Sequence, residues 1–80
     1  MNADTGAELV RLRISRYQWF ARRYRDDAAE ELYHAEEAHQ SEDSEFERIH
    51  REGVASTLKI ARLFEAEAAS MEERLHGGAD

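Results

Sequence analysis

Each of the four histidines in this chain has a glutamate three residues before it. The four pairs are Glu31 and His34, Glu36 and His39, Glu47 and His50, and Glu73 and His76. On a helix, residues three apart lie on one face, so a carboxylate oxygen and an imidazole nitrogen can converge on one cation. The spacing therefore suggests a metal site on whichever helices carry these pairs.

One of these pairs is predicted to lie in apolar surroundings. Glu31 and His34 fall on or beside a predicted apolar seam, between Ala28 and Ala35, where an unpaired charge would be expensive. The small alanines leave room for an ion. Without a metal, His34 could instead be a half-buried histidine that is hydrogen-bonded to Glu31 or to a neighbouring chain.

A turn near residue 42 would bring the Glu47 and His50 pair within about two helical turns of the first pair. The candidate metal ligands are then Glu31, His34, Glu37, Glu47 and His50. Carboxylates combined with imidazole favour iron, with manganese or zinc as alternatives. Glu47 has a second interpretation as the partner of Ser44 in a capping box. His39 and His76 lie near helix ends, where we expect structural or solvent-exposed roles.

The composition predicts an all-α protein. There is no Pro and no Cys, there are four Gly, and Ala, Glu, Arg and Leu dominate, as in long helices. No apolar run exceeds three residues, so we expect no membrane span, no signal-peptide core and a cytoplasmic location. A net charge of −7 argues against nucleic acid as the main partner.

Two seams spaced in alternating steps of four and three predict two amphipathic helices. The first seam is Val10, Ile14, Tyr17, Ala21, Tyr24, Ala28, Glu31, Ala35 and Ala38. The second is His50, Val54, Thr57, Ala61, Phe64, Ala68, Met71 and Leu75, with Glu47 one turn earlier. The phase breaks in the polar stretch between them, which predicts one domain over residues 1–80: a helix over about 6–39, a turn over about 40–44 and a helix over about 45–76.

Capping-box spacings occur near both predicted helix starts, at Thr5 with Glu8 and at Ser44 with Glu47. The predicted fold is an antiparallel two-helix hairpin. Leu12, Trp19 and Phe20 lie off the first seam, so its apolar face is wider than one neighbouring helix can cover. We therefore expect hairpins to dimerise into a four-helix bundle, and we expect a homo-oligomer in which a chain of 80 residues gains a larger core.

The first half of the chain separates its charges. Residues 9–25 carry six Arg and no acid, whereas residues 26–47 carry ten Asp or Glu and no Lys or Arg. Trp19, with Arg16 and Arg23 near it, is predicted to bind a protein partner, because exposed Trp and Arg often dominate interfaces.

The Glu-x-x-His pairs on inward faces of a predicted four-helix bundle resemble the ferritin-like di-iron carboxylate proteins, and a two-helix half-bundle is most similar to the encapsulated ferritins. On this resemblance, Glu31 or Glu37 would be the carboxylate of the first helix, and Glu47 with His50 the pair of the second. The resemblance implies oxidation of ferrous iron and a location inside a protein shell.

This resemblance covers residues of about 24–54, and it departs from the family at Phe46, where a second acid usually precedes the pair of the second helix. Two functions stay open. One is an oligomeric hairpin that binds a divalent metal, with iron favoured and ferroxidase activity implied. The other is a non-enzymatic adaptor or assembly subunit that binds a protein partner through its Arg and aromatic face.

Overall fold

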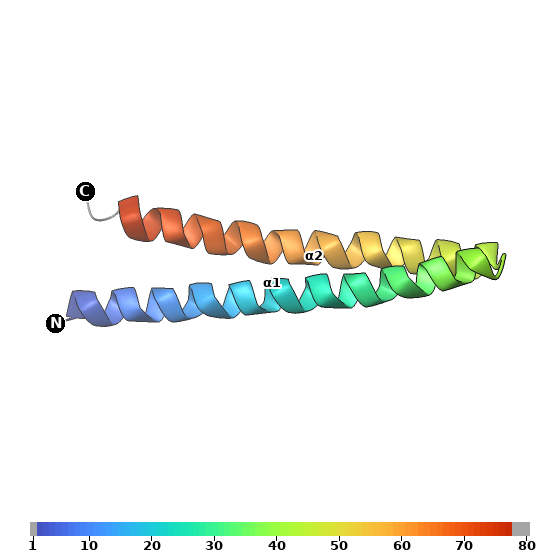
Figure 1. The fold of residues 1–80 in the computed structure, drawn as a ribbon. Coiled ribbons are helices and arrows are strands. Elements are labelled where there is room, and N and C mark those ends of the chain that lie inside the picture. The colour runs from blue at the N-terminus through green and yellow to red at the C-terminus, as the bar shows by residue number, and fades with distance from the viewer. Residues whose placement is uncertain (1, 78–80) are drawn as a thin grey trace.

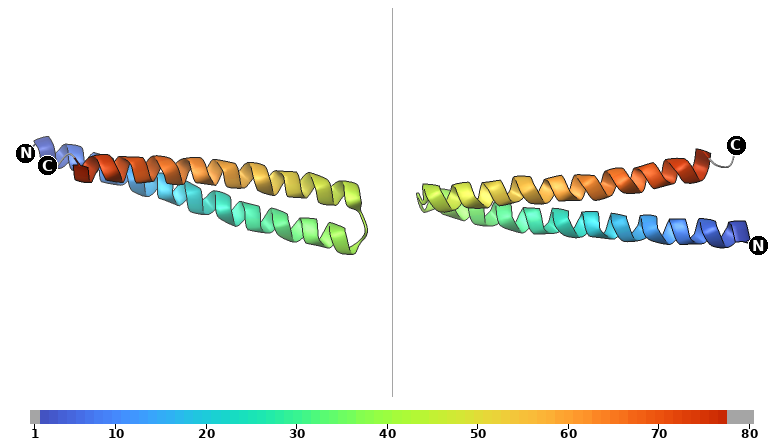
Figure 2. Two further views of the ribbon diagram at one scale, coloured as in Figure 1. Left: turned by 90° about the horizontal axis from the view of Figure 1, so that it is seen from above. Right: turned by 180° about the vertical axis from the view of Figure 1, so that it is seen from behind.

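The computed structural model describes residues 2–77 and contains two helices, α1 (Asn2–Gln40) and α2 (Ser44–Gly77), which run antiparallel (Figure 1). The predicted all-α hairpin is confirmed. The molecule measures 61 × 16 × 12 Å along its principal axes. Seen from above, the helices are apart near the turn and cross in projection toward the free ends, so they wind around each other (Figure 2).

Both predicted seams are the faces that the helices bury against each other. The buried residues are Ile14, Ala21, Ala28, Ala35, Ala38, Ala61, Ala68 and Met71. The remaining seam positions, including Tyr17, Tyr24 and Phe64, are half-buried. The steps of four and three thus identified the interface correctly on both helices, because this spacing keeps one stripe facing a supercoiled partner.

Small side chains dominate this interface. Ala21, Ala28 and Ala35 recur at every seventh position of α1, and small residues at an interface allow helix backbones to approach closely. The large residues gather toward the free ends, where Ile14 and Met71 pack with Ala68. The next layer toward the turn is aromatic, built around Phe64.

Phe64 of α2 contacts three rings of α1. Tyr17 meets it edge-on with ring centroids 5.5 Å apart, and Phe20 and Tyr24 stack on it at 5.3 and 5.7 Å. Aromatic pairs at these distances contribute beyond the area they bury. This cluster joins the two helices through four aromatic rings, and Phe20 reaches it from beside the seam.

Two contacts between exposed side chains fix the register. Gln18 Nε2 donates to Glu72 Oε1 at 3.1 Å, and Arg25 donates through Nε and Nη2 to both oxygens of Glu65. Seven residues forward along α1, from Gln18 to Arg25, therefore correspond to seven residues backward along α2, from Glu72 to Glu65. The next two levels of the same register are Leu32 opposite Leu58 and His39 opposite Arg51. We call this side of the hairpin the paired flank.

The turn between the helices closes by backbone hydrogen bonds. The amide of Asp43 donates to Ala38 O at 2.9 Å and that of Glu42 donates to His39 O at 3.1 Å, which is the Schellman pattern. Glu42 adopts a positive φ of 59°. This position usually belongs to glycine, and the chain accepts a glutamate there at some cost in backbone strain.

The helix starts differ from the capping expectations. Asp43 caps α2, because its Oδ1 accepts from the amide of Phe46 at 3.1 Å and its carbonyl accepts from the amide of Glu47 at 2.9 Å. The expected capping role of Ser44 was therefore wrong, since an aspartate one residue earlier does the same work. Helix α1 begins at Asn2, so Thr5 lies inside its first turns instead of at a cap.

The hairpin leaves much of its apolar surface exposed. Within the part of the chain that the structure describes, no large side chain is fully buried. The exposed large hydrophobic residues are Leu9, Leu12, Trp19, Leu32, Tyr33, Phe46, Ile49, Ile60 and Leu63. A core this thin, with no disulfide to support it, provides little stability for an isolated domain.

Candidate functional site

The seam near the turn contains one ionisable pair. His50 Nδ1 of α2 lies 2.9 Å from Glu31 Oε1 of α1, and the side chains are 18% and 34% exposed. Because both side chains are half-buried, this hydrogen bond satisfies a polar atom on each of them that would otherwise have no partner. Two of the predicted ligands thus contact each other across the helices.

Gly53 makes room for this pair. A Cβ added at Gly53 would lie 2.6 Å from Glu31 Oε1, so the glycine allows the carboxylate to lie against the backbone of α2. Gly53 was not among the predicted site residues. A glycine in a helix interior costs about 1 kcal/mol relative to alanine, and that cost was the available signal of a close approach.

His34 lies beside the pair without joining it. Its ring centroid is 5.6 Å from that of His50, and its Nδ1 is 3.1 Å from Glu37 Oε1 on the exposed side of α1. His34 therefore pairs with the glutamate three residues after it, not with Glu31. Phe46 covers the other face of His50, with ring centroids 4.6 Å apart and planes at 15°.

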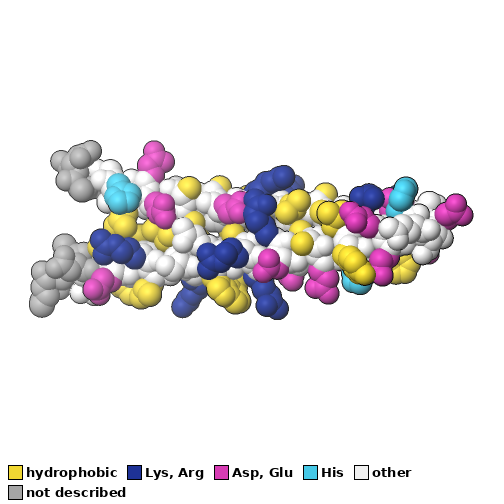
Figure 3. Space-filling view, viewed as in Figure 1, with side chains coloured by type: hydrophobic (Ala, Val, Ile, Leu, Met, Phe, Trp, Pro, Cys, Tyr) yellow, Lys and Arg dark blue, Asp and Glu magenta, His cyan; other side chains and the backbone are white. Residues whose placement is uncertain are grey.

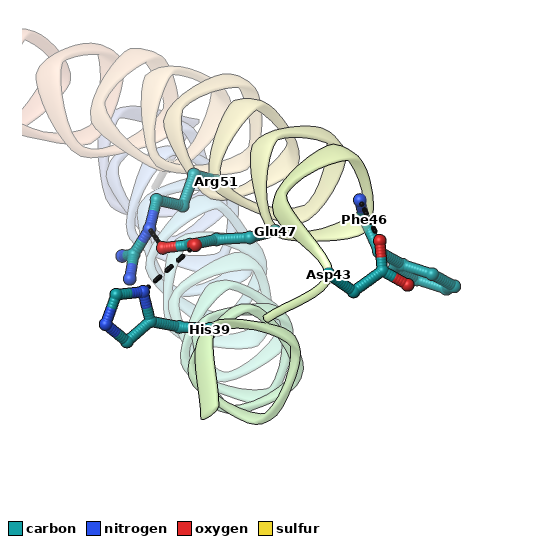
Figure 4. Close-up of polar contacts among 5 residues, drawn as sticks. All are labelled: His39, Asp43, Phe46, Glu47 and Arg51. Carbon is teal, nitrogen blue, oxygen red and sulfur yellow. Dashed lines mark hydrogen bonds and ion pairs between the residues drawn. The ribbon is translucent and has the colours of Figure 1, made fainter. Parts of the chain in front are cut away.

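Glu47, the fifth predicted ligand, points to the opposite side of the hairpin from Phe46 (Figure 4). Its carboxylate accepts hydrogen bonds from Arg51 Nε at 2.8 Å and from His39 Nδ1 at 3.1 Å. The hydrogen bond from Arg51, followed by that from His39, holds the pKa of Glu47 below its ordinary value. Glu47 thus closes the turn end of the paired flank, and His39 has a structural contact there.

The candidate ligands divide into three places. Glu31 and His50 are hydrogen-bonded to each other in the seam, and His34 and Glu37 are hydrogen-bonded at its edge. Glu47 is paired with Arg51 and His39 on the paired flank. No group of three or more His, Asp or Glu side chains within residues 2–77 is arranged to hold a metal ion. What one chain offers is a half-buried two-residue pair beside a shallow, open hollow, lined by His34, Glu37, Ala38, Ser41, Asp43, Phe46 and His50.

The predicted partner-binding residues share one stripe of α1. Arg16, Trp19 and Arg23 are exposed and follow each other in steps of three and four. Leu9 and Leu12 continue the stripe toward the N-terminus, and Trp19 is 52% exposed, with its ring edge-on to Phe20 at 5.3 Å. We call these five residues the Arg/Trp stripe. It combines a large aromatic anchor with cations.

We call the side of the hairpin opposite the paired flank the open flank, and α2 exposes large apolar side chains there. On α2 it carries Phe46, Ile49, Gly53, Ser56, Ile60 and Leu63, which we call the α2 strip. Phe46, Ile49 and Leu63 are 52%, 50% and 64% exposed. Figure 3 shows hydrophobic side chains exposed between the charged ones on one face of the molecule. The spacing of the seams did not identify the residues of the open flank as a separate surface.

No family model, curated protein or solved structure matches this chain. The resemblance to ferritin-like proteins therefore rests on the Glu-x-x-His spacing alone. Over residues 2–77, neither helix has a stretch long and apolar enough to cross a membrane.

We expect the Glu47→Gln variant to be less stable than the wild type at pH 7. A carboxylate whose pKa is lowered by folding stabilises the fold above its ordinary pKa of 4.5, and this contribution is lost as the pH falls through the lowered pKa. The difference in free energy of unfolding between variant and wild type should shrink on acidification. Denaturation followed by circular dichroism, at one protein concentration and several pH values, measures it.

Glu36→Gln controls for the loss of one negative charge, because Glu36 is an exposed glutamate of the same hairpin. It should cost less stability than Glu47→Gln at pH 7. A gap between Glu47→Gln and the wild type that stayed constant down to about pH 2 would contradict a role for the ionised carboxylate.

Proposed function

We propose that this chain is a non-enzymatic assembly module whose open flank packs against the helices of a second copy to complete a four-helix bundle. The observation that carries the proposal is the difference between the two flanks. Arg25 with Glu65, and His39 with Glu47, join the helices on the paired flank. The open flank instead exposes a row of large apolar side chains.

The open flank has the character of an interface. Four large hydrophobic side chains follow one another along α2 within residues 46–63, and Ile60 is the least exposed of them at 39%. Contiguous apolar surface of this kind on a small protein indicates a binding surface. In a four-helix bundle, each helix uses its seam plus one flanking row, which is the pattern of α2 here.

The thin core supports the same proposal. The seam is filled largely by alanines, and burial of small side chains contributes less hydrophobic free energy than burial of Leu, Ile or Phe. Four large apolar residues of α2, namely Phe46, Ile49, Ile60 and Leu63, lie on the open flank, where this chain alone does not cover them. Association would bury them and supply the stability that the hairpin lacks.

The Arg/Trp stripe extends the module toward a further protein partner. It lies on the outer face of α1, where Trp19 and Leu12 remain exposed beside Arg16 and Arg23. A helical segment with apolar and acidic residues has the complementary chemistry. This stripe supports the adaptor interpretation of the partner-binding residues.

Leu63→Glu should abolish or weaken self-association at least tenfold, because it would bury an unpaired carboxylate in the interface at a cost of more than about 1.4 kcal/mol. Ala66→Glu introduces the same charge at an exposed position of the same helix and should leave association unchanged. Sedimentation equilibrium measures both. A wild type that stays monomeric at high micromolar concentration, or two variants that behave alike, would overturn the proposal.

Metal binding is the second candidate, and the specific observation in its favour is the Glu31 and His50 contact. A carboxylate and an imidazole 2.9 Å apart, half-buried beside His34, offer oxygen and nitrogen donors of the kind that iron, manganese and zinc accept. Further ligands would have to come from a second copy. Ferroxidase activity would follow only from iron held at such a shared site.

Anaerobic calorimetric titration of ferrous iron, manganese and zinc into the metal-free protein tests this candidate. Saturable binding should be lost in His50→Ala and kept in His39→Ala, because His39 contacts Glu47 on the paired flank. Binding that survives in His50→Ala, or no binding by the wild type, would exclude the Glu31 and His50 site and leave the assembly role standing.

A further inference from the structure

The α2 strip has the same order of large and small residues, with the same spacing, in both directions along the helix. Its residues in order are Phe46, Ile49, Gly53, Ser56, Ile60 and Leu63. They are two large residues, two small residues and two large residues, separated by steps of three, four, three, four and three. The midpoint of this pattern lies between Val54 and Ala55. Such symmetry is what a surface needs to pack against an identical surface that runs the other way.

We propose that the open flank docks a second copy of this chain in antiparallel orientation, with a two-fold axis at the midpoint of the α2 strip. This inference rests on the proposed assembly function and adds the orientation of the second copy and the register of the contact. The two α2 helices would pack with Phe46 against Leu63 of the second copy and with Ile49 against Ile60 of the second copy. Each contact then occurs twice, as an isologous interface requires.

The small residues at the centre fit this arrangement. Gly53 and Ser56 of the second copy would meet near the two-fold axis, where two crossing helices come closest, with the Glu31 carboxylate that lies against Gly53 beside them. Small side chains at a crossing point let the backbones approach, and the larger residues on either side then fill the widening space. A strip of uniformly large residues would hold the helices apart at that point.

Charge complementarity selects the antiparallel orientation. Arg25 is hydrogen-bonded to Glu65, so the C-terminal end of the Arg-rich segment 9–25 lies close to the level of Leu63. Phe46 of the second copy docks at the same level. The acidic turn of the second copy, with Glu42 and Asp43, then lies at the level of these arginines. A parallel arrangement would instead place the two acidic turns, each with Glu42 and Asp43, beside each other.

The same register brings the seam pairs together. Glu31 lies against Gly53, which is next to the midpoint, so Glu31 of each copy falls at the level of the two-fold axis. The Glu31 and His50 pairs of the two copies would therefore lie on either side of it, in the interior of the bundle. This is the place where a second copy could supply the donors that one chain lacks.

Pulsed electron spin resonance on nitroxide labels tests the orientation, because a chain without cysteine can be labelled at single introduced sites. Glu45→Cys and Glu73→Cys form a matched pair on the exposed outer face of α2, and each removes one negative charge. At about 1.5 Å per residue, the antiparallel register separates the two labels along the bundle axis by roughly 30 Å for position 45 and by roughly 55 Å for position 73, and the lateral offset between the helices adds to both distances.

A parallel arrangement would give similar distances at both positions, each roughly 25 Å or less, because like residues then lie at one level. That result, or any other pair of distances, overturns the antiparallel register while the assembly function stands. A monomer with no coupling between labels overturns both proposals. Addition of Leu63→Glu to each labelled chain should remove the coupling, which ties the measured distances to the open flank.

Discussion

Alanine at every seventh position of the α1 seam determines how closely the two helices approach. Ala21, Ala28 and Ala35 are almost completely buried, and no side chain at these positions holds the backbones apart. Close approach leaves no room in the seam for large side chains, except toward the free ends and around Phe64. The larger apolar residues of α2 therefore lie beside the seam, where one hairpin cannot bury them.

The unequal flanks follow from this arrangement. On one side, charged and polar pairs such as Arg25 with Glu65 close the hairpin, and the pKa of Glu65 is lowered because Arg25 donates hydrogen bonds to it. On the other side, Phe46, Ile60 and Leu63 remain in solvent. The polar pairs solvate one flank, while the exposed apolar residues of α2 on the other flank favour association.

Spacing predicted the seams, because the alternation of three and four reports directly on which residues face a partner helix. The break in phase located the turn but did not predict its conformation, since Glu42 has a positive φ without being glycine, and Asp43 instead of Ser44 caps α2. Nor could it separate the ligand candidates. Whether Glu47 faces His50 or Arg51 depends on the flank onto which its side chain turns, and periodicity along one helix does not specify this.

We propose that this hairpin depends on association for its fold. Far-ultraviolet circular dichroism over a dilution series, from about 50 μM to about 50 nM at constant pH and ionic strength, tests this dependence, because a fold coupled to assembly depends on protein concentration. Helicity should fall as the protein is diluted, in one transition that heating shifts to higher concentration. Helicity that stays constant throughout the series would contradict it.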